Sequence, residues 1–336
     1  MWVQAQQAQQ AWWTEATAMP GMSPHHREMT GFLARQWLDA TSPSNAGLAN
    51  PEVLQRTLAS GGANLLHGAA RALDEWRQAH GLPALAHDTA LAPAPEPAAG
   101  QPTAPARPYH PGVDVAITSG KVVHRNALVE LIQYLPTTPR VQAEPVFIVP
   151  SWIMKYYILD LSPHNSLVRW LVSQGHTVFI LSWRNPDEAD ALLSMDDYLA
   201  LGIFDCLARP QRVDGAELLA PLASVSLLAA ETDFSEPGEM GVLIDEAQVA
   251  MLEDQMAERG FLTGPQMAGS FAYLHSRELV WTRRLRTMWL DEPDSPNDLM
   301  AWNADTTRMP ALMHSQYLRR CYLHNDIANG RFPVGG

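Results

Sequence analysis

The side chains best suited to covalent chemistry in this 336-residue chain are its two cysteines, Cys206 in GIFDCLARP and Cys321 in YLRRCYLHND. A cysteine attacks an acyl group as its thiolate. It therefore needs a histidine to accept its proton, an aspartate to orient that histidine, and backbone N–H groups to stabilise the oxyanion. On a hydrolase-type sheet, such a nucleophile stands in a G-x-C-x-G or G-x-S-x-G turn between a strand and a helix. Neither pattern occurs here, so no catalytic residue is predicted.

Histidines are the other candidates for acid–base or metal chemistry. Five fall in segments that already have a structural interpretation, as surface or packing residues: His164, His176, His275, His314 and His324. On a continuous helix, His314, Cys321 and His324 share one face, but a structural zinc site needs four ligands and a fourth is missing. The glycine-rich patterns of nucleotide-binding loops are also absent. No metal and no other cofactor is predicted.

The elements that would position any site are clearest between residues 146 and 186. Residues 146–149 and 176–181 are rich in β-branched and apolar side chains, which is typical of buried strands. Residues 165–174 place apolar side chains on one helical face, with Ser166 near the start and Gly175 just past the end. Parallel strands require such a crossover helix, so the pattern predicts an α/β sheet with both faces covered.

Several long segments, in order along the chain, resemble the polyhydroxyalkanoate (poly-β-hydroxybutyrate) synthases, in particular a class I-like form. They are residues 33–66 with the phrases SPSN and NPEV, residues 150–186, MDDYLALGI at 195–203, residues 223–245, and WNADTTRMP at 302–310. The resemblance implies an α/β-hydrolase fold and a polymerising acyltransferase. In that family a cysteine thiolate takes a 3-hydroxyacyl group from coenzyme A, which is released, and the polyester grows from the thiolate.

The chain departs from this family where the nucleophile is expected. In family order the nucleophile turn lies between the predicted helix 195–208 and the predicted strand 223–228, and only residues 209–222 separate them. A strand, a sharp turn and a helix do not fit in that interval. The family's aspartate and histidine come later than the last residue of this sequence. We therefore expect an internally deleted, C-terminally truncated and catalytically incompetent member of the family.

The expected architecture is α/β, with an incomplete α/β-hydrolase-type sheet, a helical N-terminal region and a helical cap. Apolar residues recur at helical spacing in 31–38, 51–58 and 64–80, whereas alanine and proline dominate 92–108. Strand-like runs at 122–123 and 127–134 precede the crossover unit. We expect four regions: a helical N-terminal region at 1–90, a linker at 91–110, a partial hydrolase core at 111–238 and a truncated cap at 239–336.

Five residues are predicted to contact substrate. Trp152 and Ile153 lie in the loop where hydrolases place one oxyanion N–H, and the backbone of this loop is the more relevant part. Trp302, Asn303 and Asp305 match a family motif that lies near the catalytic pocket. Methionine and tryptophan interleave through the cap, as in an apolar acyl channel, although ordinary packing of a helical subdomain explains the same pattern.

Composition restricts the remaining possibilities. A formal net charge of −13 argues against nucleic acid as a partner. Residues 1–16 lack the basic and apolar parts of a signal peptide, and no run of about 18 apolar residues predicts a transmembrane segment. Two cysteines without paired spacing indicate a reducing compartment, so a cytoplasmic protein is expected.

The partners implied by the resemblance are 3-hydroxyacyl-CoA and a polyester granule. A homodimer or association with an intact synthase is also considered. An amphipathic helical region that does not pack on its own core would suit such a partner. The alternative to an inactive synthase is therefore a non-catalytic interaction protein or granule-associated protein.

Overall fold

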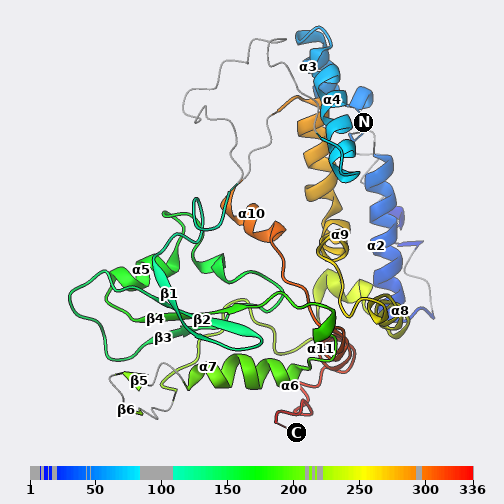
Figure 1. Ribbon diagram of the computed structural model, residues 1–336. Coiled ribbons are helices and arrows are strands. Elements are labelled where there is room, and N and C mark those ends of the chain that lie inside the picture. The colour runs from blue at the N-terminus through cyan, green and yellow to red at the C-terminus, as the bar shows by residue number, and fades with distance from the viewer. Residues whose placement is uncertain are drawn as a thin grey trace. The chain divides into compact units, whose positions relative to one another are not determined.

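The computed structural model describes residues 21–42, 44–45, 47–83, 109–208, 212–213, 216–217, 222–292 and 297–335, together with residues 8, 11–13 and 15–16. It divides into two compact units (Figure 1). Unit 1 comprises Met1–Arg107 and Gly269–Ser295, and unit 2 comprises Pro108–Ala268 and Pro296–Gly336. Most of the predicted linker, residues 91–108, lies outside the described residues.

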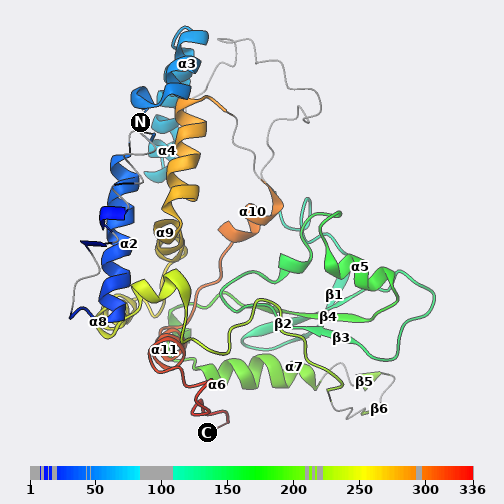
Figure 2. The ribbon, with the colours of Figure 1, turned by 180° about the vertical axis from the view of Figure 1, so that it is seen from behind.

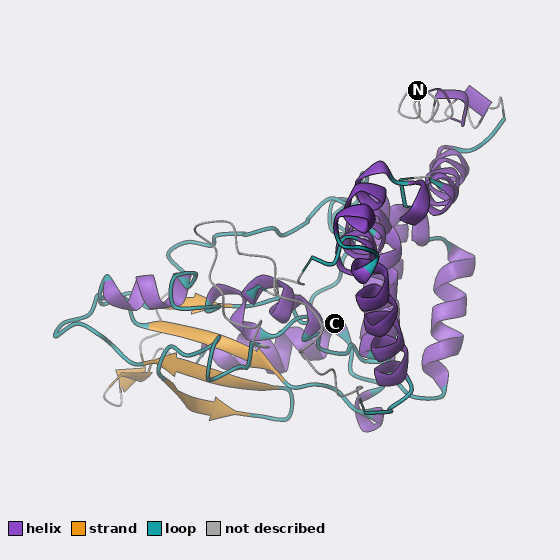
Figure 3. Ribbon diagram, turned by 90° about the horizontal axis from the view of Figure 1, so that it is seen from above, coloured by secondary structure: helices purple, strands orange, loops and turns teal. Residues whose placement is uncertain are grey.

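Unit 2 contains a four-stranded mixed sheet, seen as the layer of orange strands in Figure 3. Its strands are β1 (Gly120–Arg125), β2 (Val129–Tyr134), β3 (Val146–Ile148) and β4 (Val178–Trp183), in the order β1-β2-β4-β3. β2 pairs antiparallel with both β1 and β4, and β3 pairs parallel with β4. The predicted parallel pair is therefore confirmed, within a sheet that also has two antiparallel pairs.

The crossover helix between β3 and β4 is α5 (Leu167–Ser173), which confirms the predicted βαβ unit. Ser166 caps its start, because the side-chain oxygen accepts a hydrogen bond from the N–H of Arg169 at 3.0 Å. Gly175 follows its end with φ +83°, a left-handed conformation that glycine adopts without strain. Both helix boundaries thus follow from local sequence.

Both faces of the sheet are covered, as the sequence predicted (Figures 1 and 2). Alternate residues of β4 point to opposite faces. Val178 and Ile180 pack with Val168 and Val172 of α5. Phe179 and Leu181 pack in a second cluster that includes residues of the helix 195–207 and of α11 (Ala311–Tyr317). Unit 2 therefore has apolar cores on both sides of β4.

The remaining elements of unit 2 are mostly short helices and helical turns, in agreement with the predicted helical character after residue 239. They are η3 (Tyr156–Leu159), η4 (Glu188–Asp190), α6 (Met195–Asp197), η5 (Tyr198–Phe204), α7 (Asp205–Leu207), η6 (Gly238–Leu243), α8 (Glu246–Ala257), α10 (Asp298–Ala304) and η9 (Leu318–Leu323), with a hairpin of β5 (Arg212–Val213) and β6 (Ala216–Glu217).

The predicted strand at 223–228 is wrong. Residues 222–227 form irregular structure, a bend follows at 228–229, and neither described sheet includes them. Side-chain propensity favours a strand here, but a strand requires a neighbour to accept and donate its backbone hydrogen bonds. No described strand pairs with this segment, so its backbone joins no ladder.

Unit 1 is helical, and the three predicted N-terminal helices are confirmed. They are α2 (Pro24–Thr41), α3 (Pro51–Ala59) and α4 (Ala63–Ala79), with the short turn η1 (Gly47–Ala49) between the first two. Ser23 and Asn50 cap α2 and α3, and a proline occupies the first position of each helix. The same unit holds the turns η7 (Arg277–Thr282) and η8 (Leu285–Trp289), while α9 (Gly264–Leu274) spans the boundary between the units.

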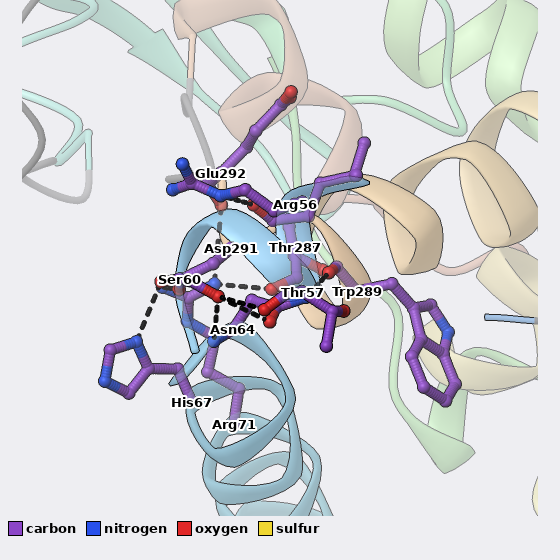
Figure 4. Close-up of polar contacts among 11 residues, drawn as sticks. Arg56, Thr57, Ser60, Asn64, His67, Arg71, Thr287, Trp289, Asp291 and Glu292 are labelled. Atoms are coloured by element: carbon purple, nitrogen blue, oxygen red, sulfur yellow. Dashed lines mark hydrogen bonds and ion pairs between the residues drawn. The ribbon is translucent and has the colours of Figure 1, made fainter. Parts of the chain in front are cut away.

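Polar side chains of α3 and α4 bind the carbonyl groups at the end of η8 (Figure 4). The Asn64 amide donates to the Trp289 carbonyl at 2.7 Å, and the Arg56 guanidinium donates to the Leu290 carbonyl at 3.1 Å. Asp291, just after η8, accepts from His67 and Arg71 of α4, each at 2.8 Å. These contacts satisfy carbonyls that a helix end leaves without intrahelical partners.

The packing of α4 on η8 is very close at Gly68. A Cβ atom built at this glycine would lie 1.7 Å from the carbonyl oxygen of Met288, so only glycine fits. Asn64, one helical turn earlier, is fully buried and also donates to Thr57 of α3. The bonds and the close approach together fix how 285–292 lies on the N-terminal helices.

Among all the described helices, none combines the length and apolar character needed to cross a membrane.

Candidate functional site

The loop that follows β3, residues 150–157, is held at its start by Trp183 at the end of β4. The Trp183 indole N–H donates to the carbonyl of Pro150 at 2.9 Å. The Trp183 ring stacks on Tyr198, with ring centroids 5.1 Å apart. Both aromatic residues are buried, so the beginning of the loop is attached to the core of unit 2.

A second segment, residues 302–308, holds the rest of the loop. The N–H of Thr307 donates to the carbonyl of Ile153 at 2.9 Å. The Trp302 indole donates to the carbonyl of Lys155 at 2.8 Å. Ile153 and Lys155 lie close together in the loop, so the loop is bonded to the 302–308 segment at two nearby residues.

The last connection is a side-chain pair. The hydroxyl of Tyr157 donates to the carboxylate of Asp305 at 2.9 Å. Burial raises the pKa of Tyr157, and the hydrogen bond to Asp305 raises it further, so the hydroxyl remains a donor throughout the neutral range. Two segments 148 residues apart in sequence are thus joined at the side of the sheet where β3 ends.

All five predicted substrate-contacting residues lie in this pair of segments, and four of them contact the other segment or the apolar cluster beneath the loop. Trp152 and Ile153 are partly buried against the apolar cluster beneath the loop, and Trp152 contacts the Tyr317 ring edge-on, with centroids 5.6 Å apart. Trp302 and Asp305 bond to the loop, whereas the Asn303 side chain is exposed and makes no hydrogen bond to any described residue. The predicted substrate contacts of all five stay predictions.

Sequence reasoning missed Tyr157, Trp183 and Thr307, which hold the loop in place. Trp183 and Tyr157 had a signal, because a buried tryptophan or tyrosine usually finds a hydrogen-bond partner for its polar tip. Thr307 acts through its backbone N–H and gave no side-chain signal.

The loop also offers free backbone donors. The N–H groups of Trp152 and Ile153 find no acceptor in the part of the chain that the structure describes. Backbone N–H donors that point to one oxygen stabilise an acyl group when negative charge develops on that oxygen. The two N–H groups are therefore available as hydrogen-bond donors to an acceptor from outside the described chain.

Neither cysteine is presented to a substrate. Cys206 is 0% exposed and Cys321 is 1% exposed. Burial raises the pKa of the Cys321 thiol to about 11, and the nearby Asp326 adds to this effect. A thiol with this pKa is almost entirely protonated at neutral pH and is a poor nucleophile. Both cysteines therefore act as small apolar core residues.

A buried serine and aspartate form the most chemically suggestive pair nearby. The Ser162 hydroxyl donates to Asp298, which also accepts from the Ser162 N–H at 3.2 Å and from the Asn165 amide at 3.3 Å. Burial acts to raise the pKa of Asp298, but these hydrogen bonds outweigh it and hold the pKa below its ordinary value. Such a carboxylate is a weak base, so the pair ties α10 to the 162–165 loop and does not activate the serine.

His314 of α11 is also unsuited to act as a base. It is buried, and burial lowers its pKa to about 4. Its Nδ1 atom has no hydrogen-bond partner among the described residues. The described residues include no group of three or more histidine, cysteine, aspartate or glutamate side chains placed to hold a metal.

Comparison with known proteins gives one consistent family. A family model described as the poly-beta-hydroxybutyrate polymerase (PhaC) N-terminus matches residues 1–93 and 99–171. A poly(3-hydroxyalkanoate) polymerase of Methylorubrum extorquens is 39% identical over 94% of this chain and 53% of its own length. The PhaC subunits of Rhizobium meliloti and Cupriavidus necator are 35% and 32% identical, over 94% and 92% of this chain and 53% and 54% of their own lengths. The chain thus spans about half the length of these curated relatives.

Proposed function

Because this chain belongs to the poly-β-hydroxybutyrate polymerase (PhaC) family, we propose that it keeps the substrate-side loop of a polymerising acyltransferase but forms no acyl-enzyme. The ligand class is 3-hydroxyacyl-CoA, and the relatives are themselves described as poly(3-hydroxyalkanoate) polymerases. The proposed contacts are the predicted set: Trp152, Ile153, Trp302, Asn303 and Asp305. The acyl oxygen would meet the N–H groups of the loop.

One observation carries this proposal: both thiols are buried in apolar cores, with exposures of 0% and 1%. A polymerase of this family needs an accessible thiolate, and a G-x-C-x-G turn to present it is absent from the sequence. An incomplete α/β-hydrolase-type sheet agrees with the order β1-β2-β4-β3, which stops at β3. An internal deletion after α7 accounts for the absent G-x-C-x-G turn and for the incomplete sheet.

The purified chain is expected to release no coenzyme A from 3-hydroxybutyryl-CoA, because it lacks the thiolate attack on which the family reaction depends. Its rate should lie more than about 10⁴-fold below that of the Methylorubrum extorquens polymerase under the same conditions. Free coenzyme A is measured by chromatography, and circular dichroism checks that the chain is folded. Turnover that is abolished by Cys206→Ala or Cys321→Ala would overturn the proposal and identify the nucleophile.

A non-catalytic interaction or granule-associated protein is the second candidate. Helices α3 and α4 expose large apolar side chains, including Leu58 at 84%, Leu66 at 74% and Trp76 at 53%. Exposed apolar groups of this size often mark a binding surface. The proposed partners are a polyester granule in the cytoplasm and an intact synthase.

This second candidate predicts that the chain sediments with purified polyester granules, and that Leu58→Ser with Leu66→Ser reduces the bound fraction about tenfold. Each serine replaces an exposed leucine and so removes apolar surface that the granule would bury. Leu192→Ser, which changes an equally exposed leucine (81%) of unit 2, is the control. Equal sedimentation of all three proteins would exclude this surface.

A further inference from the structure

The guanidinium group of Arg308, in unit 2, is held from two sides. It lies over the ring of Phe261, with the guanidinium carbon 4.3 Å from the ring centroid. Its Nε–H donates to the side-chain oxygen of Asn185 at 3.0 Å, and the backbone N–H of Arg308 donates to the same oxygen at 3.0 Å. An arginine that is ordered in this way loses less conformational freedom when it binds a ligand.

The outer edge of this guanidinium has no acceptor. Neither Nη1 nor Nη2 of Arg308 makes a hydrogen bond or an ion pair with a described residue. The acidic side chains that follow β4 are already bonded, because Asp187 and Asp190 accept from Arg184 at 3.5 and 2.5 Å and cap η4. Arg308 is therefore a positive charge that pairs with no described carboxylate, in a chain with a net charge of −13.

Asn185 adds another donor beside the guanidinium. Both groups that it meets on Arg308 are donors, so the atom that faces them is the amide oxygen. The amide nitrogen is attached to the same carbon as this oxygen, and it makes no hydrogen bond to the residues that the structure describes. Nη1 and Nη2 of Arg308 and the amide nitrogen of Asn185 are therefore available together to one acceptor group.

These donors lie at the carboxyl edge of the parallel strand pair. Asn185 follows the end of β4, and the loop 150–157 follows the end of β3, which runs parallel to β4. Arg308 is the last residue of the 302–308 segment, and its neighbour Thr307 bonds to that loop. In open α/β sheets ligands bind outside the carboxyl ends of the strands, so the position of these donors also suits a ligand site.

We propose that Arg308 and Asn185 form a binding site for a phosphate group, supplied either by inorganic phosphate or by a phosphate monoester. The two Nη atoms of a guanidinium donate in parallel to two oxygens of one oxyanion. They already satisfy both oxygens of a carboxylate, whereas a phosphate has a further oxygen for the Asn185 amide. The inference does not rest on the proposed function, because inorganic phosphate alone tests it.

Phosphorus NMR titration of the full chain with inorganic phosphate should give a dissociation constant on the order of 1 mM, because the site is partly exposed and the protein is acidic. Arg308→Gln should weaken binding at least about tenfold, and Arg308→Lys, which keeps the charge but not the paired donors, about fivefold. Asn185→Asp should also weaken binding about tenfold or more, because the new carboxylate would pair with Arg308.

Arg320→Gln is the matched control. It removes the same charge from another arginine of unit 2 that lies over an aromatic ring, with its guanidinium carbon 5.8 Å from the centroid of Phe332. This variant should change the dissociation constant less than about twofold, because charge at a distance is screened by salt. Circular dichroism checks that every variant is folded.

Coenzyme A and dephospho-coenzyme A distinguish the two sources of the phosphate group. Tighter binding of coenzyme A, lost in Arg308→Gln, would support the site with the ribose phosphate monoester as its ligand. Phosphate binding that depends on Arg308, with no difference between the two coenzymes, would support the site with inorganic phosphate as its ligand. No phosphate binding up to about 20 mM, equal affinity of Arg308→Gln and the original chain, or equally tight binding of 3-hydroxybutyrate would overturn the proposal.

Discussion

Replacing Gly68 with alanine is expected to destabilise unit 1 by about 3 kcal/mol, because the new methyl group would lie 1.7 Å from the Met288 carbonyl oxygen. The obstacle is backbone, so no side-chain rotation relieves it. To make room, α4 would have to move away from η8, which would break the bonds from Asn64 and Arg71 to its carbonyls. Hydrogen exchange in α4 and in residues 285–292, followed by mass spectrometry, measures this loss.

Gly31→Ala is the control for this substitution. Gly31 also lies inside a helix of unit 1, but no atom lies within 4 Å of a Cβ built there. Alanine favours helix over glycine by roughly 0.5–1 kcal/mol, so this variant should be as stable as the original chain or more stable. Unchanged exchange in Gly68→Ala would show that α4 and η8 do not approach as closely as described.

Acidification from pH 6.5 to pH 4 is expected to cost unit 2 up to about 3 kcal/mol through His314 alone. Burial lowers the folded-state pKa of His314 from 6.5 to about 4, so the unfolded chain takes up the proton first as the pH falls. The neutral imidazole is therefore compatible with the fold above pH 6.5. The stability is lost progressively below that value, until the folded state is protonated as well.

His314→Leu should flatten the pH dependence of urea unfolding in this window, whereas His110→Leu, at an exposed histidine, should not. The carboxylates act at lower pH. Hydrogen bonds from Arg319 and Ser315 lower the pKa of Glu253 to about 2, so its contribution is present above pH 4.5 and is lost below it. An identical pH profile for His314→Leu and the original chain would contradict the expected role of burial.

The parts of the fold that local sequence encodes were predictable. Ser166 and Gly175 marked both ends of α5, and β-branched runs marked the strands on either side. The strand predicted at 223–228 has equally good local propensity, but propensity does not supply a pairing partner. β1 and β2 pair as a local hairpin, whereas the pairing of β2 with β4 joins segments that are separated by β3 and α5 and leaves no local signal.

In the candidate site too, the sequence indicates individual residues but not the long-range bonds between them. The sequence indicated Trp152, Ile153, Trp302, Asn303 and Asp305, and the structure bonds the two segments that carry them to each other. The bonds that hold them, from Tyr157 to Asp305 and from Trp183 to Pro150, join separate parts of the chain. Hydrogen-bond partners across 148 residues cannot be read from spacing, because they depend on how the chain folds back.

The bond between Asn64 and Trp289 also has a consequence for synthesis on the ribosome. The two residues are 225 positions apart, and all of the first part of unit 2 is translated between them. At about 5–20 residues per second, the nascent α4 would wait roughly 10–45 s for η8 to emerge. During that interval its tightly fitting surface at Gly68 is uncovered, so this is the period in which a chaperone or a wrong partner would compete for it.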